Sequence, residues 1–295
     1  MEKDSLRRFI LANMQVRGEW IHLDATWQAL LTNNDYPDVV KKILGEALAA
    51  VVLLSATVKY QGSLILQIKG SGAVHLLVVQ ADSDGSVRGL ARYKDDVLSN
   101  LPVEPSLPDL LSEDAMMVIT IQPNNGSKPY QGIVALNGDT MQACLQAYFE
   151  QSEQLATRLY LAADTSTCAG MLLQRLPEQA DDKDGWNRAT ILADTLSEQD
   201  LLTWDHDMLL QRLYHEEQVT LFDRKEIRFQ CTCSVARIEG AIQSLGEAEA
   251  QDIINQQGHI QVDCEFCNKD YRFDRVDIKR IFTPAAIKPF QNSTH

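Results

Sequence analysis

The sequence predicts an α+β protein: a mainly antiparallel-sheet core with helices, then a helical linker and a small C-terminal zinc-binding domain. Three observations predict this organisation. Strand-like runs separated by tight turns fill most of the first part of the chain. An acidic stretch with helical apolar spacing follows, and two close pairs of cysteines lie near the end. We place the parts at 1–177, 178–230 and 231–295, and 295 residues are enough for such domains.

The core begins with two predicted strands, which contain residues 9–11 and 20–23. A long helix follows, because apolar residues recur at helical spacing between Val39 and Val52. Pro37 is expected near the start of this helix, and Asp35 is its candidate N-cap. The wide apolar face of the helix predicts that it is buried.

Seven further runs have the length and apolar content of strands, and turn residues bound most of them. These predicted strands are 63–69, 73–80, 86–93, 116–122, 131–137, 158–162 and 169–175. The first three form an antiparallel meander, because only short turns rich in glycine, serine or aspartate separate them. A helix capped by Asp139 or Thr140, and ending near Gln154, precedes the last two strands.

The stretch 178–230 differs from the core, because 13 acidic and 6 basic residues give it a net charge of −7. Its apolar residues still recur at helical spacing in two groups. The predicted helices contain Trp186, Ile191, Leu192, Leu196, Leu201 and Leu202, and then Met208, Leu209, Leu210, Leu213 and Tyr214. We expect a metastable segment, since its apolar stripe needs a docking surface. A permanently packed helical subdomain is the alternative.

Four cysteines form a C-x-C pair, Cys231 and Cys233, and a C-x-x-C pair, Cys264 and Cys267, thirty residues apart. Two such pairs can bring four thiolates to one tetrahedral zinc ion, so the sequence predicts one Zn²⁺ per chain. His259 is an alternative ligand, although four thiolates already complete the shell. A small zinc module has little core, so zinc supplies most of its folding energy.

The composition limits which cellular compartment and which binding partners we expect. Six cysteines without a secretion signal are typical of a reducing compartment, so we expect a cytoplasmic protein. Cys144 and Cys168 stand alone in apolar surroundings and are expected to be inert. The most apolar run, 47–56, is too short to cross a bilayer, which argues against a membrane partner. A formal net charge of −14 argues against nucleic acid.

No enzyme motif stands out, so we predict no catalytic residues. The turns at 70–72 and 137–139 match neither a dinucleotide-binding fingerprint nor a P-loop, and the six histidines form no metalloprotease motif. Zinc is therefore the one cofactor that we predict. The aspartate-rich residues 181–184 are expected to form a solvated loop, and no chemistry is given to residues 17–19.

The cysteine pattern at the end of an acidic 33.1 kDa chain resembles the heat shock protein 33 family of redox-regulated holdases, also called 33 kDa chaperonins. Other matching stretches are 16–19 (VRGE), 62–72 (GSLILQIKGSG), 148–154 (YFEQSEQ) and 170–177 (GMLLQRLP). The resemblance covers nearly the whole chain. It implies an ATP-independent chaperone that binds unfolding client proteins during oxidative stress and forms a homodimer when oxidised.

On oxidation, we predict disulfides between Cys231 and Cys233 and between Cys264 and Cys267, with release of zinc. Neighbours within a pair have the lowest loop-closure cost, although the C-x-C bridge is expected to be strained and readily reduced. Two other functions remain open: a zinc-ribbon interaction or nucleic-acid-binding module, and a thiol oxidoreductase that uses the C-x-x-C pair. Turnover of a dithiol substrate would distinguish the oxidoreductase from a holdase.

Overall fold

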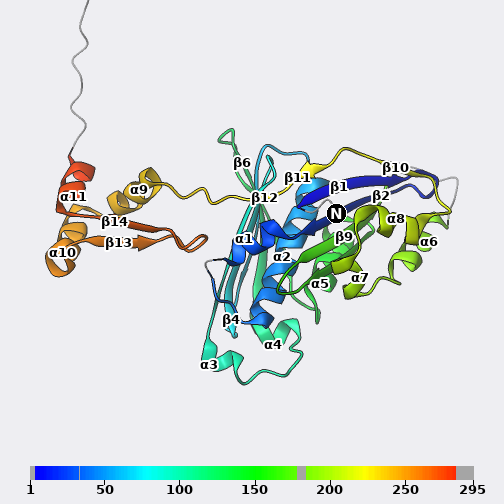
Figure 1. Ribbon diagram of the computed structural model, residues 1–295, viewed down its shortest axis with the longest axis horizontal. Coiled ribbons are helices and arrows are strands. Elements are labelled where there is room, and N and C mark those ends of the chain that lie inside the picture. Colours follow the sequence, from blue (N-terminus) through cyan, green and yellow to red (C-terminus); the bar gives the residue numbers. More distant parts are fainter. Residues whose placement is uncertain (1–3, 33, 178–183, 284–295) are drawn as a thin grey trace, which may run out of the picture. The chain divides into compact units, whose positions relative to one another are not determined.

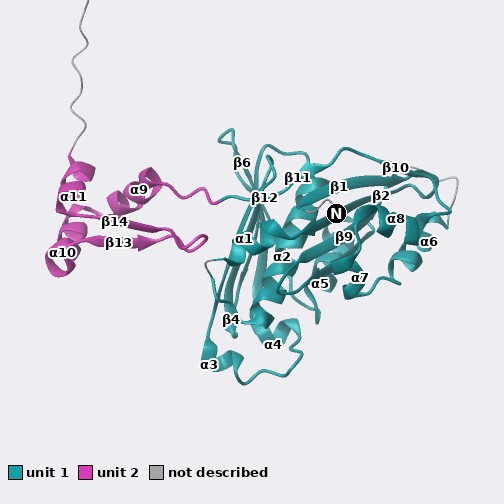
Figure 2. Cartoon of the chain, viewed as in Figure 1, with its two compact units in different colours: residues 1–230 teal, residues 231–295 magenta. Residues whose placement is uncertain are grey.

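The computed structural model describes residues 4–32, 34–177 and 184–283, which divide into two compact units at the Gln230–Cys231 bond (Figure 2). Both units combine helices with sheet that is mainly antiparallel, β12 and β5 being a parallel pair, which confirms the predicted α+β class. Within the described residues, no helix combines the length and the hydropathy that a membrane span requires.

The first unit contains two six-stranded sheets (Figure 1). Sheet A consists of β1 (Ser5–Leu11), β2 (Val16–Leu23), β8 (Thr157–Ala163), β9 (Cys168–Arg175), β10 (Val219–Leu221) and β11 (Lys225–Glu226). Sheet B consists of β3 (Gly62–Lys69), β4 (Val74–Asp82), β5 (Ser86–Tyr93), β6 (Met116–Pro123), β7 (Tyr130–Ala135) and β12 (Arg228–Phe229). The order is β10-β1-β2-β9-β8 in sheet A, where β11 also pairs with β1, and β12-β5-β4-β3-β6-β7 in sheet B. All nine predicted core strands are present.

Helix α2 (Asp38–Thr57) packs against strands of both sheets. Every residue from Ala47 to Leu54 is buried, as expected for a helix with apolar neighbours on all sides. Gly45 permits the close approach, since a Cβ there would lie 2.5 Å from the Cβ of Ala163. The predicted cap was wrong: Pro37 is the N-cap residue and no side chain caps the helix, because Asp35 lies too far before the first free N–H groups.

The remaining helices of the core are short. They are α1 (Ala25–Leu31), α3 (Asp95–Leu98), α4 (Leu107–Leu111) and α5 (Met141–Tyr148), with a 3-10 turn at Ala12–Met14. Of the two candidate caps of α5, Thr140 is the right one, because its side chain accepts a hydrogen bond from the backbone N–H of Ala143 at 3.2 Å. The predicted end near Gln154 corresponds to a π-helical turn, Phe149–Glu153, that continues α5.

Three helices of the acidic stretch cover the face of sheet A that is turned away from α2 (Figure 1). They are α6 (Gly185–Ala193), α7 (Glu198–Thr203) and α8 (His206–Tyr214). The first predicted helix is therefore two helices, since Ser197 caps α7 through the backbone N–H of Asp200. Helix α6 buries the face that carries Gly185, Ala189, Thr190 and Ala193, so Ile191 lies off this face and is 57% exposed, contrary to the prediction. Met208, another predicted stripe residue, is 42% exposed.

The linker helices and sheet A share one apolar cluster. Phe9, Trp20 and Met171 of the sheet pack with Leu209 and Leu213 of α8. The described part of the stretch, 184–230, belongs to the first compact unit. Its metastability stays a prediction. The predicted linker start, 178, and the predicted loop residues 181–183 lie outside the described residues.

The second unit holds α9 (Val235–Leu245), α10 (Glu247–Gln257), the hairpin β13 (Ile260–Asp263) and β14 (Asp270–Phe273), and α11 (Arg275–Phe282). Its buried core is small. The core residues are Ile242, Ala250, Ile254, Ile260, Cys264, Tyr271, Phe273, Ile278 and Ile281. Residues 284–295 of the predicted C-terminal domain lie outside the described residues. A core of this size gives the unit little stability of its own.

Candidate metal centre

The four predicted cysteines of the second unit lie together. Their sulfur atoms are all within 4.8 Å of one another. The Sγ atoms of Cys231 and Cys264 are 3.6 Å apart, and those of Cys233 and Cys267 are 3.5 Å apart. Zn–S bonds of about 2.3 Å in a tetrahedron place sulfur atoms about 3.8 Å apart, so the donor set fits one zinc-sized ion. Within the described residues, no other group of His, Cys, Asp or Glu side chains has such spacing.

The C-x-x-C pair sits in the turn between β13 and β14. The backbone N–H of Cys264 donates to the carbonyl of Lys269 at 3.0 Å, and the N–H of Cys267 donates to the carbonyl of Cys264 at 3.2 Å. Asn268 completes the reversal with a φ of 51°, a left-handed conformation that asparagine tolerates better than most residues. The tight turn holds both thiols at one end of the hairpin.

The C-x-C pair immediately precedes α9. Ser234 is the N-cap of this helix and accepts a hydrogen bond from the backbone N–H of Arg237 at 3.3 Å. The guanidinium group of Arg237 donates to Oγ1 of Thr232, between the two cysteines, at 2.6 Å. The start of α9 therefore fixes the short Cys231 and Cys233 segment, and the partial positive charge of the helix N-terminus favours thiolates there.

Tyr271 is a contributor that sequence reasoning missed. Its hydroxyl group donates to Sγ of Cys233 at 3.1 Å. The ring is nearly buried in the core of the unit, and Nζ of Lys269 lies 5.3 Å from its centroid. The one available signal was the position of Tyr271 in the strand directly after the C-x-x-C turn.

The four thiols have unequal acidity without a metal. Burial, together with hydrogen bonds from the other cysteines, raises the pKa of Cys231 to about 12. Burial acts in the same direction on Cys233, but hydrogen bonds from Tyr271 and the neighbouring thiols outweigh it and lower its pKa to about 7. Four adjacent thiolates repel one another, so a cation is needed for all four to be ionised at neutral pH.

The remaining candidate thiols and ligands lie elsewhere. His259 is not part of the sulfur cluster, and its Nδ1 atom accepts a hydrogen bond from Arg272 at 3.2 Å. Cys144 and Cys168 are buried in the first unit, and burial raises the pKa of both thiols. They are therefore poor nucleophiles, as expected from the sequence.

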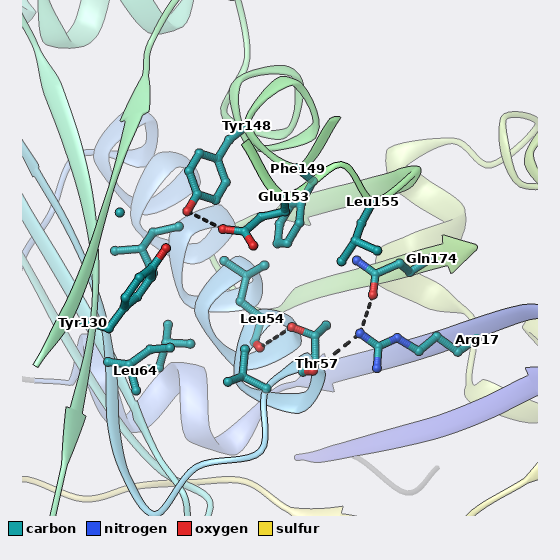
Figure 3. A pocket seen from close by; sticks show the side chains of 14 residues that line it. Arg17, Leu54, Thr57, Leu64, Tyr130, Tyr148, Phe149, Glu153, Leu155 and Gln174 are labelled. Atoms are coloured by element: carbon teal, nitrogen blue, oxygen red, sulfur yellow. Dashed lines mark hydrogen bonds between the residues drawn. The ribbon is translucent and has the colours of Figure 1, made fainter. Parts of the chain in front are cut away.

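A cavity of about 240 Å³ lies at the C-terminal end of α2, where residues of both sheets line it (Figure 3). Most of its lining is apolar, and its polar side chains contact one another. Arg17 donates to Gln174 and to the carbonyl of Thr57, and Tyr148 donates to Glu153 at 2.8 Å.

Comparison with known proteins gives consistent matches. Residues 4–274 match the sequence model of a family described as Hsp33 protein. A protein of Nitrosococcus oceani named 33 kDa chaperonin is 45% identical over 293 residues, which covers 99% of each chain. A protein of the same name from Methylobacillus flagellatus is 40% identical over 295 residues, again covering 99% of each chain.

A solved structure also resembles this chain. It is the crystal structure of the 33 kDa chaperonin (heat shock protein 33 homologue) from Thermotoga maritima, with a TM-score of 0.80. The match covers 94% of this chain and 97% of the other at 18% sequence identity. At this identity the likeness concerns the fold alone.

Proposed function

This chain belongs to the Hsp33 protein family, and we propose that it is a chaperone of the holdase kind. It would bind unfolding client proteins without ATP, prevent their aggregation, and become active in the cytoplasm during oxidative stress. No catalytic activity is proposed. The observation that carries the redox part is the cluster of four cysteine sulfur atoms in a unit with a small core.

Cys231, Cys233, Cys264 and Cys267 are the proposed ligands of one Zn²⁺ per chain. Zinc would hold these side chains as thiolates and contribute about 10 kcal/mol to the folding of the second unit. Three of the four cysteines are partly exposed, so small oxidants can reach them. The proposed ligand set therefore serves both as a structural centre and as a sensor.

Oxidation of a thiol pair takes two electrons. One thiolate attacks peroxide, the O–O bond breaks, and a sulfenic acid and hydroxide form. The second thiolate then attacks the sulfenic sulfur, and the S–S bond forms as a second hydroxide leaves. Two peroxide molecules therefore convert four thiolates into two disulfides, which no longer ligate the metal.

We propose that the disulfides join Cys231 to Cys233 and Cys264 to Cys267. Two close sulfur–sulfur contacts run between the pairs, from Cys231 to Cys264 and from Cys233 to Cys267. Loop closure nevertheless favours neighbours once the unit begins to unfold. Peptide mapping of the oxidised protein tests this pairing, and a link between Cys231 and Cys264 would contradict it.

The change then reaches the linker through the chain. Between α8 and Cys231 the chain forms three short strands, β10, β11 and β12, of three, two and two residues. We propose that an unfolded second unit no longer anchors these marginal strands, so α6–α8 detach from sheet A. The exposed faces of sheet and helices form a contiguous apolar surface that can hold clients. The acidic linker would keep the complex in solution.

Zinc content and suppression of aggregation, measured before and after treatment with peroxide at mildly raised temperature, test the proposal. The reduced protein should hold one zinc and suppress little, and the oxidised protein should hold none and suppress stoichiometrically. Sedimentation should show a homodimer of the oxidised form. Catalytic turnover of a dithiol would instead support an oxidoreductase, which the raised pKa of Cys267 and the burial of Cys264 disfavour.

A further inference from the structure

A second cavity of the first unit, of about 680 Å³, lies between α2, α4, the start of α5, β8 and the linker helix α7. Its volume is in the range of small-molecule sites. Part of the lining is apolar, with Val39, Ile43, Leu110, Met141 and Leu161. The cavity also carries an unusual number of carboxylates. They are Asp38, Glu46, Glu104, Asp139, Asp164 and Glu198.

Few basic side chains line this cavity among the described residues. Lys42 is the sole basic residue, and its Nζ atom is already paired with both carboxylate oxygens of Glu198, at 3.0 and 3.1 Å. Asp164 accepts hydrogen bonds from Ser166 and Thr167 of its own loop. Asp38 is paired with Lys41 at 3.0 Å, which leaves Glu46, Glu104 and Asp139 as lining carboxylates that can attract a positively charged ligand.

Glu46 is the carboxylate that most requires a ligand. It lies on α2 and is half-buried, and its side chain forms no hydrogen bond with any residue that the structure describes. Burial raises its pKa to about 7, Lys42 opposes this shift, and Glu198 adds to it. A carboxylate that is partly removed from water and has no hydrogen bond is less stable in its charged form, and a bound cation would stabilise that form.

The arrangement also decides what kind of cation fits. The six carboxylates are not close enough to share a metal ion, since the four cysteines are the one such group in the described chain. They are instead spread around an apolar lining. Ammonium groups separated by methylene segments match this alternation, because the methylenes can pack on apolar side chains while the charges reach carboxylates.

We propose that this cavity binds a linear polyamine, which bridges Glu46 of α2 and Glu198 of α7. Because α7 is a linker helix, the bound polyamine would hold the linker against the core. Ammonium groups stay charged from pH 6 to 8, whereas Glu46 gains a proton as the pH falls through about 7. Since the ionised fraction of Glu46 sets the apparent affinity, binding should weaken about tenfold from pH 8 to pH 6.

Calorimetric titration of the reduced full-length protein with spermidine tests the site. Glu46→Gln should weaken binding at pH 8 and abolish the pH dependence, and Asp139→Asn, across the cavity, should weaken binding without abolishing it. The matched control is Glu216→Gln, which removes the same charge from a side chain that is 85% exposed and does not line the cavity. We expect the Glu216→Gln variant to bind spermidine with the same affinity as the wild-type protein.

Hydrogen exchange with spermidine present should show slower exchange in α7. Glu198→Gln should weaken this protection. Spermidine binding of equal affinity by the wild type, Glu46→Gln and Asp139→Asn would overturn the proposal. So would an equal effect of magnesium chloride at matched ionic strength, because it would show screening of charge and not a built site. Binding without protection of α7 would contradict the bridge to Glu198.

Discussion

The two faces of sheet A are covered by helices of different kinds. On one face α2, with 20 residues, buries twelve of them, in a cluster that also includes strands of sheet B. On the other face α6, α7 and α8 have 9, 6 and 9 residues and bury four, one and four. Removing α2 would open both sheets, whereas removing the linker helices would open one face of one sheet.

Side-chain polar contacts between helices α6–α8 and the rest of the unit are few and separate, and one of them is the ion pair of Lys42 with Glu198 at 3.0 Å. The Tyr160 hydroxyl donates to Asp194 at 2.6 Å, and Nε2 of His22 donates to the carbonyl of Leu202 at 3.0 Å. Arg7 lies 3.8 Å from Asp207, and exposed ion pairs of this kind contribute little. Sheet A therefore has an extensive covering on one face and a slighter one on the other, and we expect the slighter one to detach first.

The largest effect is expected from the second unit, because its nine-residue core depends on the proposed metal. Cys264→Ser should remove most of the zinc and unfold this unit even under reducing conditions, at a cost of about 10 kcal/mol. The covering by α2 should persist. Metal analysis and circular dichroism measure both results.

Cys144→Ser is the matched control, because Cys144 is buried in the first unit and is not in the sulfur cluster. It should retain one zinc per chain. Undiminished zinc in the Cys264 variant would remove Cys264 from the site.

A large effect is also expected when the linker covering alone is weakened. Leu209→Ser with Leu213→Ser removes two buried side chains, at about 2–5 kcal/mol each. The double variant should suppress aggregation while it is still reduced and holds zinc. Met208→Ser is the control, since Met208 lies on the same helix but is 42% exposed.

The double variant would contradict the account if it stayed inactive while reduced. If hydrogen exchange shows that the linker of the double variant is released, yet the protein stays inactive until it is oxidised, linker release is not the gate. The client surface would then lie in the second unit.

Local patterns in the sequence were sufficient for the strands and the cysteine cluster. The strands β1–β9 were predicted from strand length and turn residues. The clustering of the four cysteines was predicted from the C-x-C and C-x-x-C spacings. Both signals come from residues that are neighbours in the sequence. The break at Ser197 was missed, because one continuous helical period was assumed from Trp186 to Leu202. The exposure of Ile191 was also missed, because α6 buries small residues, Gly185, Ala189 and Ala193, and not its largest apolar ones.

Other features could not be predicted because they depend on tertiary contacts. The amphipathic stripe of α8 indicated that it docks, but not that it docks on the second face of sheet A. Contact between Tyr271 and Cys233 depends on how the hairpin and the start of α9 meet. The cavity beside Glu46 is lined by residues of α4, α7 and β8, which are far apart in the sequence, so no local pattern marks it.

A moderate effect is expected from one linker hydrogen bond. Tyr160→Phe removes the bond to Asp194 and should destabilise linker docking by about 1 kcal/mol, or about fivefold faster exchange in α6. Tyr60→Phe makes the same chemical change in the core, where the hydroxyl donates to the carbonyl of Ala81. This control should leave hydrogen exchange in α6 unchanged. If both variants speed exchange in α6 equally, the Tyr160 hydrogen bond does not hold the linker helices on sheet A in particular.

The smallest effect is expected from pH. Burial first, and then Arg7, lowers the pKa of His206, at the start of α8, below its ordinary value of 6.5. The released linker therefore binds more protons than the docked one, and docking should weaken as the pH falls below about 6.5. Exchange in α8, corrected for intrinsic rates, measures this. His206→Gln should remove the dependence, whereas His215→Gln, at a residue whose side chain is 64% exposed, should keep it.

Hydrogen exchange of the wild-type protein during peroxide treatment tests the central claim most directly, because it reports both coverings of sheet A and the second unit together. We predict that the second unit loses protection with its zinc, that α6–α8 follow, and that aggregation suppression rises with their release while α2 stays protected. Aggregation suppression that appears while α6–α8 remain protected, or that requires α2 to open, would contradict the account.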